Sequence, residues 1–315
     1  MQVVKFSINI PLSQTDPAGE FQTPEAVHEI AAALEQSSAA AGNFSDHPAP
    51  SANWLHNHYT GHDTIDPFTG LAFVASLTTR LKLHTSVLIL PYRNPFLTAK
   101  AAATLQVLSG GRLILGVGAG YQKREFEALG VSFSQRGALM DEALETIRLA
   151  WAGDTVVKQG ATFDARGNDI RPIPSPPPPI WIGGNSDKAM ERAARHGDGW
   201  SPFLTHLNKD TFEDEGSINS MAALGRKIGR LRELRGAMGK SPEIDIAVAT
   251  RSMPTANTRS EAQRYCEIVE ELDSLGVTWI FDILRAPNRA AYIENLGWFS
   301  ETVMSRFGDE KPRAN

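Results

Sequence analysis

Short apolar segments alternate with longer helix-forming segments along almost the whole chain, and this alternation constrains the fold more than any other sequence feature. The predicted strands cover residues 3–10, a weak segment before Ser45, and residues 81–90, 112–118, 180–184, 198–203, 243–250 and 277–284. The predicted helices cover residues 23–38, 66–79, 96–108, 134–151, 186–197, 221–238, 259–275 and 288–306. About eight strands, each followed by a helix, are the pattern of a parallel (β/α)8 barrel. We therefore predict an α/β fold, a (β/α)8 TIM barrel with insertions.

The chain has 315 residues, a length at which α/β barrels routinely fold as one domain. We expect residues 1–307 to form a single TIM-barrel domain and residues 308–315, GDEKPRAN, to form a disordered tail. Three segments interrupt the alternation. Residues 46–65 are predicted as a long loop, residues 152–178 as an irregular excursion that ends in a run of prolines, and residues 204–220 as a mobile loop.

The composition is that of an ordinary soluble globular protein. The formal net charge is −5, which argues against nucleic acid as a partner because phosphate neutralisation needs a basic face. No signal peptide and no membrane-spanning segment is predicted. The single cysteine, Cys266, fits a reducing cytoplasm, and its place in an amphipathic segment favours a buried structural thiol over a nucleophile.

Three glycines follow the apolar run from Leu113 to Leu115: Gly116, Gly118 and Gly120. A dinucleotide-binding turn would need such glycines after the first strand, with an acidic residue about twenty positions later. Here they follow roughly the fourth strand, and no acidic residue has a suitable place. In a barrel, glycine at a strand's C-terminal end lets the backbone approach a flat cofactor. The alternative is a flexible strand exit without a ligand.

Six segments in order carry a resemblance to a known family: FSDHPAPS, LHTSVLILPYRNPF, LSGGRLILGVGAGY, EFEALGV, PPIWIGGNS and GDGWSPF. Together they resemble the bacterial-luciferase-like monooxygenase superfamily, and within it the deazaflavin branch that uses coenzyme F420. The match runs from about residue 3 to residue 203 and is weaker over the last third. The resemblance implies a barrel oxidoreductase that binds a flavin-type cofactor across the strand C-termini, commonly as a homodimer.

The resemblance places His47 beside the cofactor ring, where it would deliver or remove a proton near the hydride-transfer carbon. An imidazole titrates near neutral pH and suits this role. Asp46 would either orient His47 or accept a hydrogen bond from the cofactor. The alternative is that both residues cap a turn before Pro48.

Further cofactor contacts are implied by the resemblance at two strand ends. The peptide between Ser86 and Val87 is expected to be cis, forming a bulge that supports the central ring. Gly118 and Gly120 would lie near the cofactor, and Gly183, Gly184 and Asn185 would follow its ribityl-phosphate side. One residue of 185–187 is expected to cap the next helix, whose free backbone N–H groups suit a phosphate. An ordinary capped helix after a glycine turn is the alternative.

Tyr121 departs from the deazaflavin sugar dehydrogenases, which have an active glutamate at the matching position. A phenol can donate a hydrogen bond or a proton but is a poor base at neutral pH, since its reference pKa is about 10. Tyr121 therefore remains a catalytic candidate, while a sugar-phosphate dehydrogenase mechanism is disfavoured.

Aromatic side chains are predicted to wall an apolar substrate pocket, although each fits a core position equally well: Trp54, Tyr92 and Phe203. His58 and His62 are four residues apart, but a stretch that contains Gly61 is not expected to be helical and no glutamate of the metalloprotease type lies between them, so no metal site is expected. We expect this loop to face the substrate, with solvated histidines as the alternative. The basic segment 225–236 is predicted as a solvated helix face, with docking of an anionic cofactor tail as the alternative.

The leading hypothesis is an F420-dependent oxidoreductase that transfers hydride between deazaflavin and a small organic substrate. The alternative is an FMN-dependent monooxygenase that uses molecular oxygen. A third hypothesis is a cofactor carrier on a degenerate barrel, for which Tyr121 is the only support.

Overall fold

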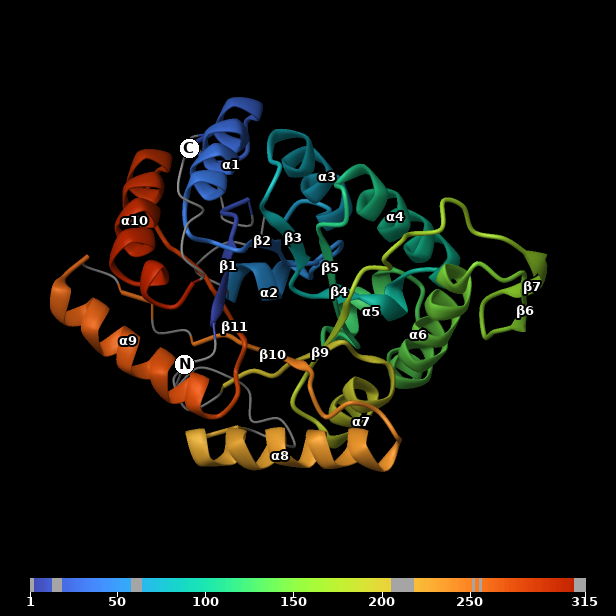
Figure 1. Cartoon of the computed structure of the whole chain (residues 1–315). Helices are drawn as coiled ribbons and strands as arrows, with labels where there is room; N and C mark the ends of the chain where they lie inside the picture. The colour runs from blue at the N-terminus through green and yellow to red at the C-terminus, as the bar shows by residue number, and fades with distance from the viewer. Residues whose placement is uncertain are drawn as a thin grey trace.

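Parallel strands close into a barrel surrounded by helices, as predicted (Figure 1). The computed structural model describes residues 3–12, 19–57, 64–204, 218–250, 253–254 and 257–308. The barrel strands are β1 (Lys5–Asn9), β2 (Ala41–Phe44), β3 (Lys82–Thr85) with its continuation β4 (Leu88–Ile89), β5 (Leu113–Gly118), β8 (Ile180–Gly183), β9 (Gly199–Ser201), β10 (Asp245–Val248) and β11 (Trp279–Asp282). Each pairs in parallel with its neighbours in this order, and β11 pairs with β1 to close the cylinder.

Several of the helices that cover the barrel begin at capping residues and prolines that mark helix starts in the sequence. They are α1 (Pro24–Gln36), α3 (Pro67–Leu77), α4 (Pro95–Leu108), α5 (Lys123–Ala128), α6 (Arg136–Ala152), α7 (Asp187–His196), α8 (Met221–Ala237), α9 (Arg259–Ser274) and α10 (Arg289–Thr302). Thr23 and Asp66 cap α1 and α3 through their side chains, each with proline at the first position.

Two of the predicted irregular segments contain regular structure. The predicted loop 46–65 contains a short helix, α2 (Ala52–Asn57), which is too short to show an amphipathic period. The excursion 152–178 contains an antiparallel hairpin of β6 (Val156–Gln159) and β7 (Asp164–Asn168), which projects beyond α6 (Figure 1). Its strands are largely exposed, so no regular alternation of apolar residues marks them.

The barrel interior is partly polar on the β1–β3 side. The Asn43 amide donates to Ser7 Oγ at 2.9 Å, and Ser7 Oγ lies 3.1 Å from Nδ1 of His84. Complete burial lowers the pKa of His84 to about 3, so this ring is neutral. The opposite faces of the strands carry apolar residues that pack against the helices, such as Phe6 and Leu83.

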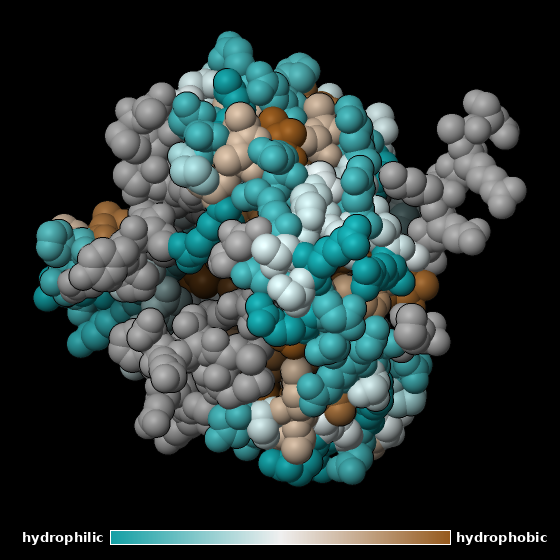
Figure 2. Space-filling view, turned by 90° about the vertical axis from the view of Figure 1, so that its left-hand side faces the viewer, coloured by the Kyte–Doolittle hydropathy of each residue, from teal (hydrophilic) through white to brown (hydrophobic). Residues whose placement is uncertain are grey.

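Cys266 lies on α9 with 1% of its surface exposed, which confirms the predicted buried thiol. Burial raises its pKa, so the thiol stays protonated at neutral pH. The face seen from the α9–α10 side is mainly hydrophilic, with scattered apolar residues (Figure 2). None of the helices in the described part of the chain is long and apolar enough to cross a membrane.

Candidate active site

The predicted site residues lie at one end of the barrel, where the parallel strands end. His47 follows β2, Ser86 follows β3, Gly118 ends β5, and Gly183 ends β8. The carboxyl ends of the strands form the face on which barrel enzymes carry their active sites. The fold therefore brings together residues that are far apart in the sequence.

The His47 ring is held from one side by α5 and its preceding residue. Nδ1 of His47 lies 3.0 Å from Gln122 Nε2 and 3.4 Å from Glu125 Oε2. The Trp54 ring packs against the imidazole at 4.7 Å between centroids, and the Tyr121 ring meets it edge-on at 6.1 Å. With 11% of its side chain exposed, His47 lies just below the surface of the mouth.

Asp46 does not orient His47, contrary to the first of its two predicted roles. Arg93 binds its carboxylate with both terminal nitrogens, at 2.6 and 3.1 Å, and the Ile89 backbone N–H donates to it at 2.9 Å. Burial raises the pKa of Asp46, although Arg93, Ile89 and His47 favour its charged form. The bidentate pair ties the end of β2 to the segment after β4, so Asp46 fixes the backbone on which His47 is carried.

Glu125 is the carboxylate that reaches His47, and only 1% of its surface is exposed. It accepts a hydrogen bond from Ala49 N at 3.0 Å and another from the Tyr92 hydroxyl at 2.9 Å. Burial opposes its ionisation, but the hydrogen bonds from His47, Ala49 and Tyr92 outweigh burial and lower the pKa of Glu125. Burial and the same carboxylate raise the pKa of Tyr92, so its phenol remains a donor.

The Ser86–Val87 peptide is cis, as the resemblance implied. The Val87 side chain packs into space that two glycines leave open. A Cβ on Gly118 would lie 2.9 Å from Val87 Cγ2, and one on Gly183 would lie 3.1 Å from Val87 Cγ1. These glycines thus leave the space that the Val87 side chain fills. Their contact with a cofactor stays a prediction. Gly120 is held in the left-handed region at φ +79° beside Ile89.

The turn from β8 into α7 combines a helix N-terminus with a lysine. Ser186 caps α7 by accepting from Ala189 N, and Gly184 turns the chain at φ +120°. Lys227 from α8 donates to the Asn185 carbonyl at 3.0 Å and lies 3.6 Å from Asp187. A helix N-terminus beside an ammonium group is suited to an anion.

Asn185 uses its side chain for the fold. Its amide nitrogen donates to the Phe203 carbonyl, and its amide oxygen accepts from Phe203 N, each at 2.7 Å. A cofactor would therefore meet the backbone of Asn185 rather than its amide. The basic segment 225–236 is also not wholly solvated, since Arg235 is buried and donates to the Ser241 and Gly197 carbonyls.

The three predicted pocket aromatics do not form one cluster. Trp54 and Tyr92 lie on the His47 side, where Tyr92 also packs on Phe126 at 4.6 Å. Phe203 follows β9, which is opposite β2 in the barrel order, and its ring packs on Phe281 at 6.5 Å. Tyr121 is 59% exposed at the rim.

The described part of the chain holds no group of histidine, cysteine or acidic residues that could bind a metal ion. His56 lies on α2, whereas His58, His62 and Asp63 fall outside the described residues, as do the greater part of segment 204–220 and residues 309–315 of the tail.

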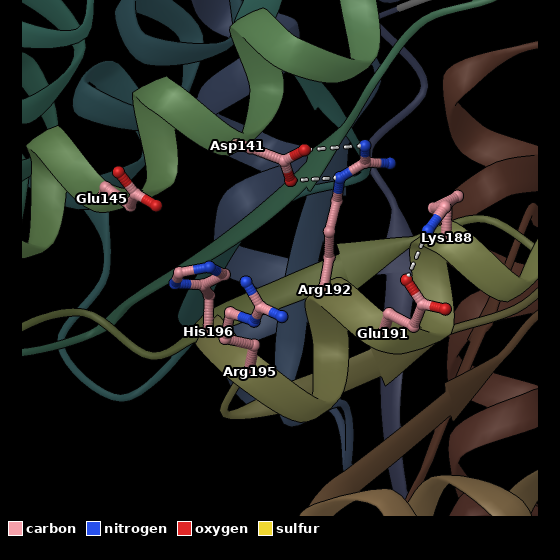
Figure 3. A pocket seen from close by; sticks show the side chains of 7 residues that line it. All are labelled: Asp141, Glu145, Lys188, Glu191, Arg192, Arg195 and His196. Carbon is pink, nitrogen blue, oxygen red and sulfur yellow. Dashed lines mark hydrogen bonds and ion pairs between the residues drawn. The ribbon is translucent and has the colours of Figure 1, made fainter. Parts of the chain in front are cut away.

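A charged crevice of about 220 Å³ lies between α6 and α7 on the outside of the barrel (Figure 3). Its charged groups largely pair with one another: Arg192 binds Asp141 at 2.6 Å, and Lys188 binds Glu191 at 2.8 Å. Burial lowers the pKa of His196 at its edge, which favours a neutral ring. This crevice thus offers few unpaired charged groups among the described residues that line it.

Comparison with known proteins identifies the family. A family model described as luciferase-like monooxygenase matches residues 4–313. The chain belongs to the luciferase-like monooxygenase family. This confirms the family that the six sequence segments indicated.

Two relatives of this luciferase-like protein come from Mycobacterium tuberculosis. An uncharacterised protein is 31% identical over 310 residues, which are 96% of each chain. A phthiodiolone/phenolphthiodiolone dimycocerosates ketoreductase is 29% identical over 218 residues, which are 67% of this chain and 54% of that relative.

Solved structures agree in fold at low sequence identity. An F420-dependent secondary alcohol dehydrogenase in complex with an F420-acetone adduct has a TM-score of 0.74 at 17% identity, covering 96% of this chain and 98% of that one. The oxygenating constituent of 3,6-diketocamphane monooxygenase from Pseudomonas putida, in complex with FMN, also has a TM-score of 0.74, at 15% identity, covering 97% and 99%. Proteins of similar fold thus include one solved with an F420 adduct and one solved with FMN.

Sequence reasoning missed three residues of the mouth: Arg93, Gln122 and Glu125. Arg93 and Glu125 lie within segments that carried the family resemblance, PYRNPF and EFEALGV. The sequence offered one signal for these residues. It is a charged residue in an apolar segment that follows the end of a strand. The six-residue α5 is too short for its buried face to be predicted from periodicity.

Proposed function

We propose that this luciferase-like protein is a coenzyme F420-dependent oxidoreductase that transfers hydride to a carbonyl or unsaturated organic substrate. The observation that carries the proposal is the placement of His47 at the barrel mouth with Nδ1 engaged by Gln122 and Glu125, so that proton exchange with a substrate falls to Nε2. When bound, reduced deazaflavin would supply the hydride. The F420-dependent alcohol dehydrogenase and the ketoreductase among its relatives support this reaction class.

The residues present fit a tricyclic ring with a ribityl-phosphate tail. Val87 would support the ring from the cis bulge, and the α7 N-terminus with Lys227 would hold the phosphate. Ser201, paired in register with Gly183, has a buried hydroxyl without a hydrogen-bond partner among the described residues, and offers a polar contact beside this path. The protein's own contribution is orientation, electrostatics and exclusion of water.

The pocket residues have distinct proposed roles. Trp54 packs on His47 and would limit the access of water to the imidazole. Tyr121, at the rim, would contact the substrate and donate a hydrogen bond. We further propose a cytoplasmic homodimer, which the single buried Cys266 and the family resemblance support.

The same fit holds for FMN, whose ring and phosphate tail have the same arrangement, and the FMN-containing monooxygenase of similar fold supports this second function. Titration of the purified protein with F420 and, separately, with FMN tests the proposal by fluorescence quenching. We expect saturable binding of F420 and weak or absent binding of FMN. FMN binding alone would establish the monooxygenase alternative, and binding of neither would contradict both functions.

Replacing Lys227 with methionine is expected to weaken F420 binding about tenfold. This corresponds to the loss of about 1.4 kcal/mol of binding free energy from one charge-assisted contact to the phosphate. The control is Lys158→Met on the β6–β7 hairpin, because the Lys158 side chain has the same 20% exposure as Lys227 and pairs with Glu145 instead of lying at the α7 N-terminus. Equal affinities of the two variants would place the phosphate elsewhere.

A further inference from the structure

Three groups surround the buried carboxylate of Glu125. Ala49 N donates to Oε1, while the Tyr92 hydroxyl and His47 Nδ1 both approach Oε2. Ala49 follows His47 by two residues, so Glu125 holds both the imidazole and the backbone that carries it. Glu125 is only 1% exposed, and burying a carboxylate costs free energy. The hydrogen bonds from its partners offset this cost.

The two groups that face Nδ1 of His47 require opposite protonation states of that nitrogen. An ionised carboxylate only accepts hydrogen bonds, so Glu125 requires a proton on Nδ1. The Gln122 amide presents its nitrogen and requires a bare Nδ1. An amide can turn about its terminal bond and present its oxygen instead, whereas a carboxylate has no such alternative. Glu125 should therefore decide the outcome.

We propose that Glu125 is a positioning residue that keeps a proton on Nδ1 of His47, so that Nε2 is the nitrogen that exchanges a proton with the substrate. For catalysis this rests on the proposed function. As a carbonyl carbon gains a hydride from the reduced deazaflavin, which is oxidised, the π pair moves to the carbonyl oxygen and that oxygen takes the proton from Nε2. His47 passes from imidazolium to neutral imidazole and retains its Nδ1 proton throughout.

Other charged and titratable groups among the described residues face the same ring. They are the Asp46–Arg93 pair from the ends of β2 and β4, Tyr92, and Tyr121 after β5. The Asp46 charge is compensated by Arg93 at 2.6 Å, and burial and Glu125 raise the pKa of Tyr92, which keeps its phenol neutral. Among the described residues, Glu125 is thus the anionic group directly bonded to the imidazole.

Glu125→Gln provides a test with a definite sign. The Ala49 backbone N–H can only donate, so it should fix the new amide oxygen on its own side, where it donates at 3.0 Å to Glu125. The new NH2 group then faces Nδ1 of His47 and should donate to it. The tautomer should invert, with the proton on Nε2.

Long-range 1H–15N spectra of the cofactor-free protein at pH 8 measure this directly, with His47 assigned by its loss in His47→Ala. We expect protonated Nδ1 in the wild type, bare Nδ1 in Glu125→Gln, and no change in Glu127→Gln, an exposed glutamate of the same helix. Bare Nδ1 in the wild type, or an unchanged tautomer in Glu125→Gln, would overturn the proposal. Should Glu125→Gln not fold, the wild-type spectrum still decides.

Kinetics separate this inference from the proposed function. With F420, Glu125→Gln should lower kcat at least about tenfold, and by no more than the about 10²- to 10⁴-fold that a general acid contributes. On the His47→Ala background it should cause no further loss. An additional loss there would show that Glu125 acts independently of His47. If F420 does not bind at all, the proposed function fails while the tautomer measurement stands.

Discussion

The His47→Ala variant is expected to turn over about 10²- to 10⁴-fold more slowly than the wild type, the range that a positioned acid–base group contributes. Its dissociation constant for F420 should stay within about threefold of the wild-type value. A threefold change corresponds to about 0.7 kcal/mol of binding free energy, and we expect the loss of the imidazole to cost less than this. The imidazole is held by Glu125, Gln122 and Trp54 at the edge of the mouth, so its removal should leave the bulge at Val87 and the α7 N-terminus unaltered.

The measurement combines steady-state kinetics with fluorescence titration of the same preparations. His28→Ala is the matched control, because His28 is an exposed histidine on α1, outside the barrel. If His47→Ala lost cofactor affinity while kcat was preserved at saturating cofactor, His47 would be a binding residue and its role in proton exchange would be excluded.

Gly116→Ala is expected to lower the free energy of unfolding by at least about 3 kcal/mol. This is the upper end of the usual cost of inserting extra atoms into a well-packed core. A Cβ at this position of β5 would lie 2.1 Å from the backbone oxygen of Thr85 and 2.9 Å from Nε2 of His84. The Thr85 oxygen belongs to the backbone of the adjacent strand β3 and cannot rotate away. The two strands would have to separate at the point where Thr85 Oγ1 donates to the Gly116 carbonyl at 2.7 Å.

Urea unfolding followed by circular dichroism measures this effect. The control is Gly229→Ala on the exposed side of α8, where a Cβ meets nothing within 4 Å. This control should raise stability by about 0.5–1 kcal/mol, because alanine replaces glycine inside a helix. A Gly116→Ala protein as stable as the wild type would mean that β3 and β5 do not approach each other as described.

The barrel could be predicted from the sequence because most of its strands and helices carry a local signal. Thr23 and Asp66 precede proline at helix starts, and the run 113–118 is apolar and buried throughout. The β6–β7 hairpin lacks such a signal, because its strands are exposed on most of their surface.

The site could be predicted only in part, because its partners meet through tertiary structure. His47 and the Ser86–Val87 bulge follow from a family resemblance. Glu125 lies 78 residues from His47 along the chain, and no periodicity links the two. The pairing of Asp46 with Arg93 could not be predicted for the same reason, since the two residues lie 47 positions apart.

The proposed function requires a deazaflavin ring in the barrel mouth, supported by Val87 and with its reactive edge toward His47. A crystal structure of the protein soaked with F420 would show where the ring binds. We expect electron density for a tricyclic ring against the Ser86–Val87 bulge, with the phosphate at the N-terminus of α7 near Lys227. Density in the crevice between α6 and α7, or an unaltered mouth in crystals shown to contain F420, would contradict it.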